Sequence, residues 1–285
     1  MTVCHAEEPS AVRKNDVGVL FDDGLENAAE AVARIYPDIK SGLERAIGWE
    51  IDFYPRIYLV KDHERFELMA GHSLVVGYAV PEKMVIVIDY SRVLTDPFSL
   101  SSIMKHELCH LLLHRYIQKT NLPKWLDEGV SQWVSGGLAD IVTANNSSLD
   151  RAVVTGRLIP FRYLSKGFPD DKESLTLAYA QSRSLVEYIV DESGPEGLQA
   201  ILNSLRSGKD MNSTLYRTLQ VSFDELEKNW YSAVNKKATW LTLLIAHLYE
   251  IIFFLGAVSL IVAYVKIAIR KRAMRYEDDD DEITR

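Results

Sequence analysis

Two short segments of the chain carry side chains able to hold a metal ion. The first is HELCH (106–110), an H-E-x-x-H motif within an apolar run typical of a helix. Residues four apart lie on one face of an α-helix, so His106 and His110 can reach the same ion. Glu107 then lies beside that ion, where its carboxylate can serve a bound water.

The second segment is PKWLDEG (123–129), which predicts another helix because proline favours the first helical turn. A catalytic zinc site has three protein ligands and one open position, so two histidines need one further ligand. Glu128 is the natural choice. The sequence therefore predicts one zinc ion at His106, His110 and Glu128. The alternative is a buried helix whose histidines are only hydrogen-bonded.

Two nearby side chains are expected to stay out of this metal site. His114 continues the four-residue spacing, but eight residues of helix rise about 12 Å, so His106 and His114 cannot bind one ion. We expect His114 to be structural or to face solvent. Cys109 is turned partly away from the histidines, and we expect it to act as a small buried apolar residue.

The runs HELCHLLLH and LPKWLDEG resemble the gluzincin zinc metallopeptidases, specifically the peptidase MA-like group. The resemblance extends to MVIVIDYS (84–91) and AYAQSRSLVEYIVDESG (178–194), so it covers roughly residues 50 to 230. It implies hydrolysis of peptide bonds, with zinc on the three ligands named above and Glu107 as general base. The metzincins are excluded, because their pattern needs glycine and histidine where this chain has Leu113 and Tyr116.

One residue departs from the pattern of the related enzymes. They usually carry an acidic residue four positions after the glutamate ligand, where it accepts a hydrogen bond from a ligand histidine, and this chain has Gln132. An amide oxygen can still orient the ring, but it raises the basicity of the ring less than a carboxylate does. Asp127 is the other nearby acid, and its place in the motif predicts that it faces solvent or a loop.

The resemblance also implies a donor for the tetrahedral oxyanion, commonly a tyrosine or histidine from the helical lobe. Tyr179 is the first choice by its place in AYAQSRSLVEYI; its alternative role is an ordinary aromatic packed between helices. Arg183, one turn on, could instead contact substrate or a carboxylate. Peptidases of this architecture bind extended substrates along an edge strand. The run 84–88 fits that strand, a neighbour of it, or a buried central strand.

The order of the predicted elements gives the fold class. Strands are predicted at 51–60, 74–80 and 84–89, and helices at 25–47 with a break at Pro37, 62–70, 177–190, 196–205, 212–219 and 224–233, besides the two metal helices. Strands first and helices later predict an α+β fold. We expect a zincin-like, two-lobed domain over 16–236. Its N-terminal sheet plus metal helix and its C-terminal helical lobe would enclose the metal.

An almost unbroken apolar run, Trp240–Val265, follows that domain. A helix of this length spans about 39 Å, so we predict a transmembrane helix with the lipid bilayer as a partner. More Lys and Arg residues follow the run than precede it. The positive-inside rule then places the tail, 266–285, in the cytoplasm and the zinc domain outside it. The prediction is a single-pass membrane protein with an extracytoplasmic catalytic domain.

The N-terminal segment, 1–15, has no charged start and no apolar core, but Cys4 and Ala6 before acidic residues resemble the end of a cleavable signal peptide. The hypothesis is that a signal peptide begins upstream, and the alternative is an ordinary N-terminal segment. The net charge of −8 argues against nucleic acid as a partner. Two cysteines define no disulfide framework.

Together these features predict a membrane-anchored zinc metallopeptidase acting on peptides or proteins, including membrane-associated ones. Two alternatives stay open. One is a non-catalytic protein of the same fold that binds or scaffolds at the membrane, although Glu107 argues against it, since a scaffold needs no base. The other is a zinc hydrolase of non-peptide bonds, because zinc-activated water also attacks esters and other amides.

Overall fold

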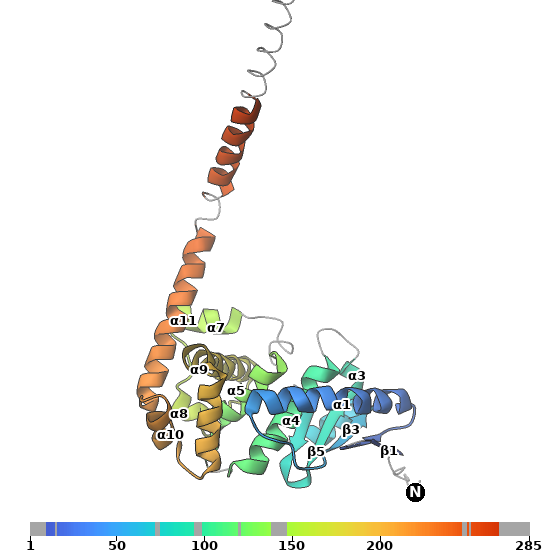
Figure 1. Cartoon of the computed structure of the whole chain (residues 1–285). Helices are drawn as coiled ribbons and strands as arrows, with labels where there is room; N and C mark the ends of the chain where they lie inside the picture. Colours follow the sequence, from blue (N-terminus) through green and yellow to red (C-terminus); the bar gives the residue numbers. More distant parts are fainter. Residues whose placement is uncertain are drawn as a thin grey trace, which may run out of the picture. The chain divides into compact units, whose positions relative to one another are not determined.

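The computed structural model describes residues 10–14, 16–71, 75–93, 99–118, 121–137, 147–246, 250 and 252–267. The chain divides into two compact units, residues 1–233 and 234–285, and each is described by itself. Within the first unit, Figure 1 shows the strands with α1 and α4 on one side and α5, α8, α9 and α10 on the other. The predicted α+β class, with strands first and helices later, is confirmed.

The first lobe is built on a five-stranded sheet of order β1-β2-β3-β5-β4. Its strands are β1 (Ser10–Lys14), β2 (Val17–Phe21), β3 (Arg56–Val60), β4 (Gly77–Val80) and β5 (Val85–Asp89). β2, β3 and β5 run parallel, and their apolar, largely buried sequences are typical of strands covered on both faces. β1 and β4 are antiparallel edges. The run 84–88 is therefore a central strand, and its neighbour β4 is the edge.

Helix α1 (Glu26–Ile47) packs on this sheet and runs straight through Pro37. The predicted break at that proline is wrong. A proline inside a helix removes one hydrogen bond and costs about 3 kcal/mol. Here the ring is exposed, while Val32, Tyr36 and Leu43 on the opposite stripe are at most 1% exposed. Burial of that stripe, at about 1.5–3 kcal/mol for each large side chain, outweighs the local cost.

Three short elements complete the first lobe: α2 (His63–Ala70), the 3₁₀ turn Pro81–Lys83 and α3 (Tyr90–Val93). The predicted helix over 62–70 is confirmed, and Asp62 caps it by accepting a hydrogen bond from the Arg65 backbone N–H. The tight turn between β4 and β5 places Met84 at φ 52°. This turn folds β4 back along β5 and fixes their register.

The N-terminal hairpin was not predicted. β1 pairs only with β2 and is almost wholly exposed, so its sequence carries no alternation of buried and exposed residues. Pairing with β2, and not its own sequence pattern, makes it a strand. The apolar run VGVLF (17–21) was the one available signal. Residues 1–9, which include the proposed end of a signal peptide, lie outside the described residues.

The second lobe is helical. Helix α4 (Leu100–Tyr116) packs against α1 and β4 on one side and against α5 on the other, so it lies between the sheet and this lobe. The helices of the second lobe are α5 (Lys124–Ser135), α7 (Ser147–Thr155), α8 (Phe161–Leu164), α9 (Lys172–Arg206), α10 (Met211–Thr218) and α11 (Phe223–Ala246). α9 is kinked where Gly194 takes φ 72° before Pro195, which matches the predicted break between 190 and 196. α5 packs against α4 on one side and α9 on the other.

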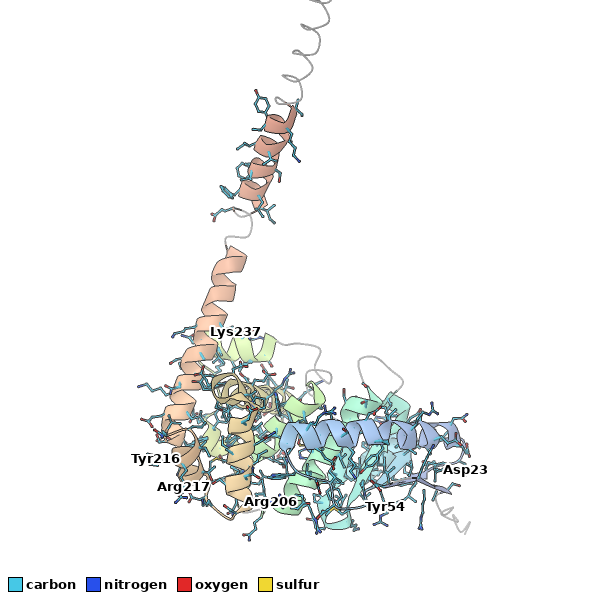
Figure 2. The ribbon with its side chains drawn as sticks, in the orientation of Figure 1. Asp23, Tyr54, Arg206, Tyr216, Arg217 and Lys237 are labelled. Carbon is cyan, nitrogen blue, oxygen red and sulfur yellow. The ribbon has the colours of Figure 1, made fainter. Side chains whose placement is uncertain are left out.

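The C-terminal end of α9 ties the helical lobe back to the first lobe. Arg206, labelled in Figure 2, lies 4.2 Å from the ring centroid of Tyr116 and 5.3 Å from that of Trp49. The Trp49 indole Nε1–H donates to Asn203 Oδ1 at 2.7 Å. A cation stacked on two aromatic rings contributes about 0.5–1 kcal/mol for each contact. These contacts help to hold the two lobes on either side of α4.

The predicted transmembrane helix over Trp240–Val265 is wrong. Among the described residues, no helix is both long and apolar enough to cross a membrane. The first half of α11 carries acidic and basic side chains. The predicted bilayer contact and single-pass location therefore have no support. Residues 268–285 lie outside the described residues.

The packing of α5 on α9 predicts that adding a methyl group at Gly129 destabilises the fold. A β-carbon at Gly129 would lie 2.4 Å from the Ser182 carbonyl oxygen and 2.8 Å from Val186. Gly129→Ala should therefore lower the free energy of unfolding by about 1–3 kcal/mol, because the two helices must separate. Denaturant unfolding of the metal-free protein measures it. Gly167→Ala, where the added β-carbon meets nothing within 4 Å, is the control. Equal stability of the two variants would contradict the packing.

Candidate metal centre

Helices α4 and α5 bring the predicted ligands together. His106 and His110 lie one turn apart on α4, which is buried along most of its length. Glu128 projects from α5, which begins after Pro123 at φ −65°. All three side chains are buried, at 6%, 9% and 4% exposure. The predicted helices thus face each other with the three ligand side chains between them.

The three donor atoms form a small triangle. His106 Nε2 and His110 Nε2 lie 3.1 Å apart, and each is 3.5 Å from Glu128 Oε2. Zinc bonds of about 2.0–2.1 Å in tetrahedral geometry separate two ligand atoms by about 3.4 Å. Glu128 Oε2 is buried and has no hydrogen-bond partner among the described residues. Its unpaired oxygen, aimed at two imidazole nitrogens, fits a bound divalent ion of the size and donor preference of zinc.

Asp127 supports this triangle, contrary to the prediction that it faces solvent or a loop. Its side chain is 4% exposed. Oδ1 lies 2.7 Å from His110 Nδ1, and Oδ2 lies 3.1 Å from His114 Nε2. Adjacent residues are about 100° apart around a helix, so Asp127 faces the later turns of α4 while Glu128 faces the ion position. The carboxylate fixes the ring of His110, leaving Nε2 for the metal.

Of the two roles predicted for His114, structural or solvent-facing, the structure favours the first. Its Nε2 contacts the second carboxylate oxygen of Asp127. His110, His114 and Asp127 also place ligand atoms within 4.8 Å of one another. Cys109 is a free, fully buried thiol, and burial raises its pKa to about 12. This matches the small buried residue that the sequence predicted.

Gln132 does not occupy the place expected for it. It is buried and lines the cleft. However, His106 Nδ1 is buried without a hydrogen-bond partner among the described residues, so Gln132 does not bond that nitrogen. The ring that receives a carboxylate in this structure is His110, through Asp127. In this structure the carboxylate that orients a candidate ligand histidine is therefore Asp127, directly before Glu128, and not a residue four positions after Glu128.

Lys124 is a site residue that the sequence reasoning missed. Its Nζ donates to Glu128 Oε1 at 2.6 Å and lies 3.7 Å from Asp127 Oδ2. The signal was available, because a lysine and a glutamate four apart on a helix are neighbours. The motif pattern by itself points only to Glu128 as the ligand.

The charged side chains of the cleft shift one another's pKa values. Burial alone would raise the pKa of Glu128, but Lys124 and His110 hold it well below its ordinary value. Burial would lower the pKa of His110, but Asp127 and Glu128 raise it well above the usual range. Burial raises the pKa of Glu107. Two glutamates in one cleft therefore have opposite shifts, and Glu107 is the more basic of the two.

The edge strand passes close to Glu107. A β-carbon at Gly77 would lie 2.9 Å from Ile103 and 3.4 Å from Glu107 Oε1, so only a glycine lets β4 approach this closely. The cleft has a volume of about 490 Å³. It is bounded by β4 and the segment before it, by α4 and α5, and by the start of α9. Glu107 is thus within reach of anything bound along β4.

Tyr179 lines the same cleft from α9. Its ring packs edge-on against Phe168 with centroids 5.1 Å apart. The negative charge of Glu128 and burial raise the pKa of Tyr179 well above its ordinary value. Its hydroxyl therefore stays protonated and able to donate a hydrogen bond. Arg183, the alternative, lies one turn further on and donates to Glu187 at 2.7 Å.

Comparison with known proteins agrees with this geometry. The sequence profile of the Peptidase MA superfamily matches residues 55–236, most of the first unit, and the chain belongs to that superfamily. The predicted resemblance to gluzincin-type peptidases is confirmed. A comparison with curated protein sequences finds no match.

Solved structures share the fold at low sequence identity. Yeast LTA4 hydrolase in complex with bestatin superposes with a TM-score of 0.50 and 14% identity, over 73% of this chain and 36% of that one. The M1 zinc metallopeptidase of Deinococcus radiodurans, as a mutant, gives 0.46 and 12% over 79% and 51%. The chain thus spans about a third to a half of their length. The likeness to LTA4 hydrolase concerns the fold, and the sequence profile assigns the chain to the Peptidase MA superfamily.

The support of His110 by Asp127 can be tested through zinc affinity. Asp127→Ala removes the carboxylate from both histidines, and loss of such a partner typically weakens metal binding 10–100-fold. Asp127→Asn, which keeps an oxygen facing the His110 Nδ1–H, should weaken it less. Competition with a chromophoric chelator gives the zinc Kd. Asp38→Ala, at an exposed position on α1, is the control. An unchanged Kd in Asp127→Ala would show that the contact does not support the ligand.

Proposed function

We propose that this protein is a zinc-dependent peptidase that uses His106, His110 and Glu128 as metal ligands and Glu107 as general base. One observation carries the proposal: three donor atoms converge at 3.1–3.5 Å beside a buried carboxylate that is not one of them. When bound, zinc polarises a substrate carbonyl and lowers the pKa of a coordinated water towards about 7.

Glu107 performs the proton transfers in this proposal. It follows His106 directly, so its carboxylate lies beside the metal position and not in the ligand triangle. Burial raises its pKa, which makes the carboxylate a stronger base towards the attacking water. The same group then returns the proton to the amine that leaves when the peptide bond breaks.

The substrate backbone is proposed to lie along β4. That strand pairs with β5 through one edge, and no other described strand pairs with its second edge. An extended peptide can add to such an edge through main-chain hydrogen bonds. Val75, Val76, Leu122 and Leu175 give the cleft apolar walls for side chains. We infer that the substrate is a peptide or an extended protein segment.

Tyr179 is proposed as the donor that stabilises the tetrahedral oxyanion. It faces the cleft from α9, across from the β4 edge and close enough to Glu128 and Glu107 for their charges to raise its pKa. A neutral, protonated hydroxyl is the form that an oxyanion needs. Its contact with Phe168 holds the ring in place.

The test of this function separates chemistry from metal binding. Glu107→Gln removes the base but keeps the shape of the side chain, so it should abolish turnover while the zinc Kd stays within about twofold of wild type. The assay is a digest of a mixed peptide library by the zinc-loaded protein, with and without chelator, read by mass spectrometry. Zinc content is measured on the same samples.

Two results would contradict the peptidase. A wild-type protein that binds zinc but cleaves no peptide would point to a hydrolase of another bond. A Glu107→Gln variant that digests peptides as fast as wild type would remove Glu107 from the mechanism. Cleavage by wild type that chelator stops, and that the variant lacks, is the expected outcome.

Tyr179 has its own prediction. Tyr179→Phe removes one oxyanion donor, which should lower kcat about 10²-fold with little change in KM, because the hydrogen bond strengthens only in the transition state. Steady-state kinetics on a peptide from the library digest measures both constants. Tyr216→Phe, at a tyrosine 71% exposed on α10 and labelled in Figure 2, is the control. A raised KM at unchanged kcat would instead assign Tyr179 to substrate binding.

A further inference from the structure

The two oxygens of Glu128 have different surroundings. Oε1 accepts a hydrogen bond from Lys124 Nζ at 2.6 Å. Oε2 is buried without a hydrogen-bond partner among the described residues and lies 3.5 Å from both imidazole Nε2 atoms. The carboxylate is therefore held with one oxygen facing the ligand triangle and the other facing a lysine.

The lysine is well fixed for this task. It is the first residue of α5, directly after Pro123, and it stands four residues before Glu128 on the same helix. Its Nζ also lies 3.7 Å from Asp127 Oδ2, so two carboxylates hold it in place. Charge-assisted hydrogen bonds as short as 2.6 Å are among the strongest in proteins. Rotation of Glu128 towards a metal ion would break this bond.

This restraint matters because a glutamate can bind zinc through one oxygen or through two. A catalytic site needs three protein ligand atoms and one open position. A second oxygen from Glu128 would crowd that position and compete with water or with the substrate carbonyl. The hydrogen bond from Lys124 to Oε1 keeps this second oxygen away from the metal position.

We propose that Lys124 is a positioning residue that restricts Glu128 to a single metal-binding oxygen, Oε2, and so keeps the fourth zinc position open. The proposal rests on the proposed function, since it concerns the same metal site. Lys124 also lines the cleft, and the role proposed for it acts through Glu128.

Removal of the Lys124 charge should affect zinc affinity and turnover differently. A cation near the site repels zinc, so its removal should not weaken metal binding. A Glu128 freed to bind through two oxygens should hold zinc at least as tightly as before. Turnover should fall at the same time, because the open position is crowded. A lysine that merely stabilised α5 would behave differently, since its loss would weaken zinc binding and turnover together.

The decisive measurement is the crystal structure of the zinc-loaded, full-length wild-type protein and of Lys124→Met, because it separates the oxygens of Glu128 from a water in the fourth position. Wild type should show one oxygen of Glu128 at bonding distance from zinc, and the variant should show both. The zinc Kd of the variant should be unchanged or lower, while kcat/KM on a library-derived peptide falls about tenfold. Lys124→Arg should restore the single oxygen and most of the activity. Lys228→Met, at an exposed lysine of α11, is the control.

Three results would overturn the proposal. They are two Glu128 oxygens on zinc in the wild type, identical coordination in wild type and Lys124→Met, or a zinc Kd raised tenfold or more in that variant. The wild-type structure decides even if the variant fails to fold. A wild type that binds zinc through one Glu128 oxygen but cleaves no peptide would refute the peptidase and leave the role of Lys124 standing. A wild type that binds no zinc would refute the proposed function itself.

Discussion

The rotation of α5 about its own axis is the constraint on which the site depends. Gly129 presses α5 against the Ser182 carbonyl of α9, where a β-carbon would approach to 2.4 Å. That contact turns the two preceding residues towards α4. Because neighbours on a helix point about 100° apart, Glu128 meets the imidazole Nε2 atoms while Asp127 meets His110 Nδ1. One close helix contact thus sets both the ligand and its support.

Buried charge is the second constraint, and it explains the pairing around the site. Glu107, Asp127 and Glu128 are each at most 5% exposed. An unpaired buried charge costs several kcal/mol, so each carboxylate needs a compensating cation or must lose its charge. Lys124 and His110 compensate Glu128, and His110 compensates Asp127. Burial dominates at Glu107, whose raised pKa suits a base. The proposed ligand and the proposed base therefore differ by their neighbours and not by residue type.

The sheet brings the backbone of β4 next to these buried charged side chains. β4 is placed by its antiparallel register with β5, and Gly77 lets it lie against α4 beside Glu107. The result is a cleft lined both by β4, whose second edge pairs with no described strand, and by Tyr179. The helical lobe and the sheet are held together away from the cleft, by Arg206 stacked on Tyr116 and Trp49. The lobes are thus joined without filling the site.

The sequence by itself determined the metal motif, the α+β order and the helix ranges around the site, because these follow from local spacing and periodicity. Helical spacing made His106 and His110 neighbours, and the glycine and proline at 194–195 marked the kink of α9. Tertiary structure decided what depends on partners: the strand β1, the straight course of α1 through Pro37, and the inward turn of Asp127. The apolar run after residue 240 misled the prediction, since no helix among the described residues is both long and apolar enough to cross a membrane. Asp127 became a site residue only when α5 packed against α4, since contacts between helices are set by packing and not by either helix alone. The contact of Lys124 with Glu128, in contrast, follows from their spacing within α5.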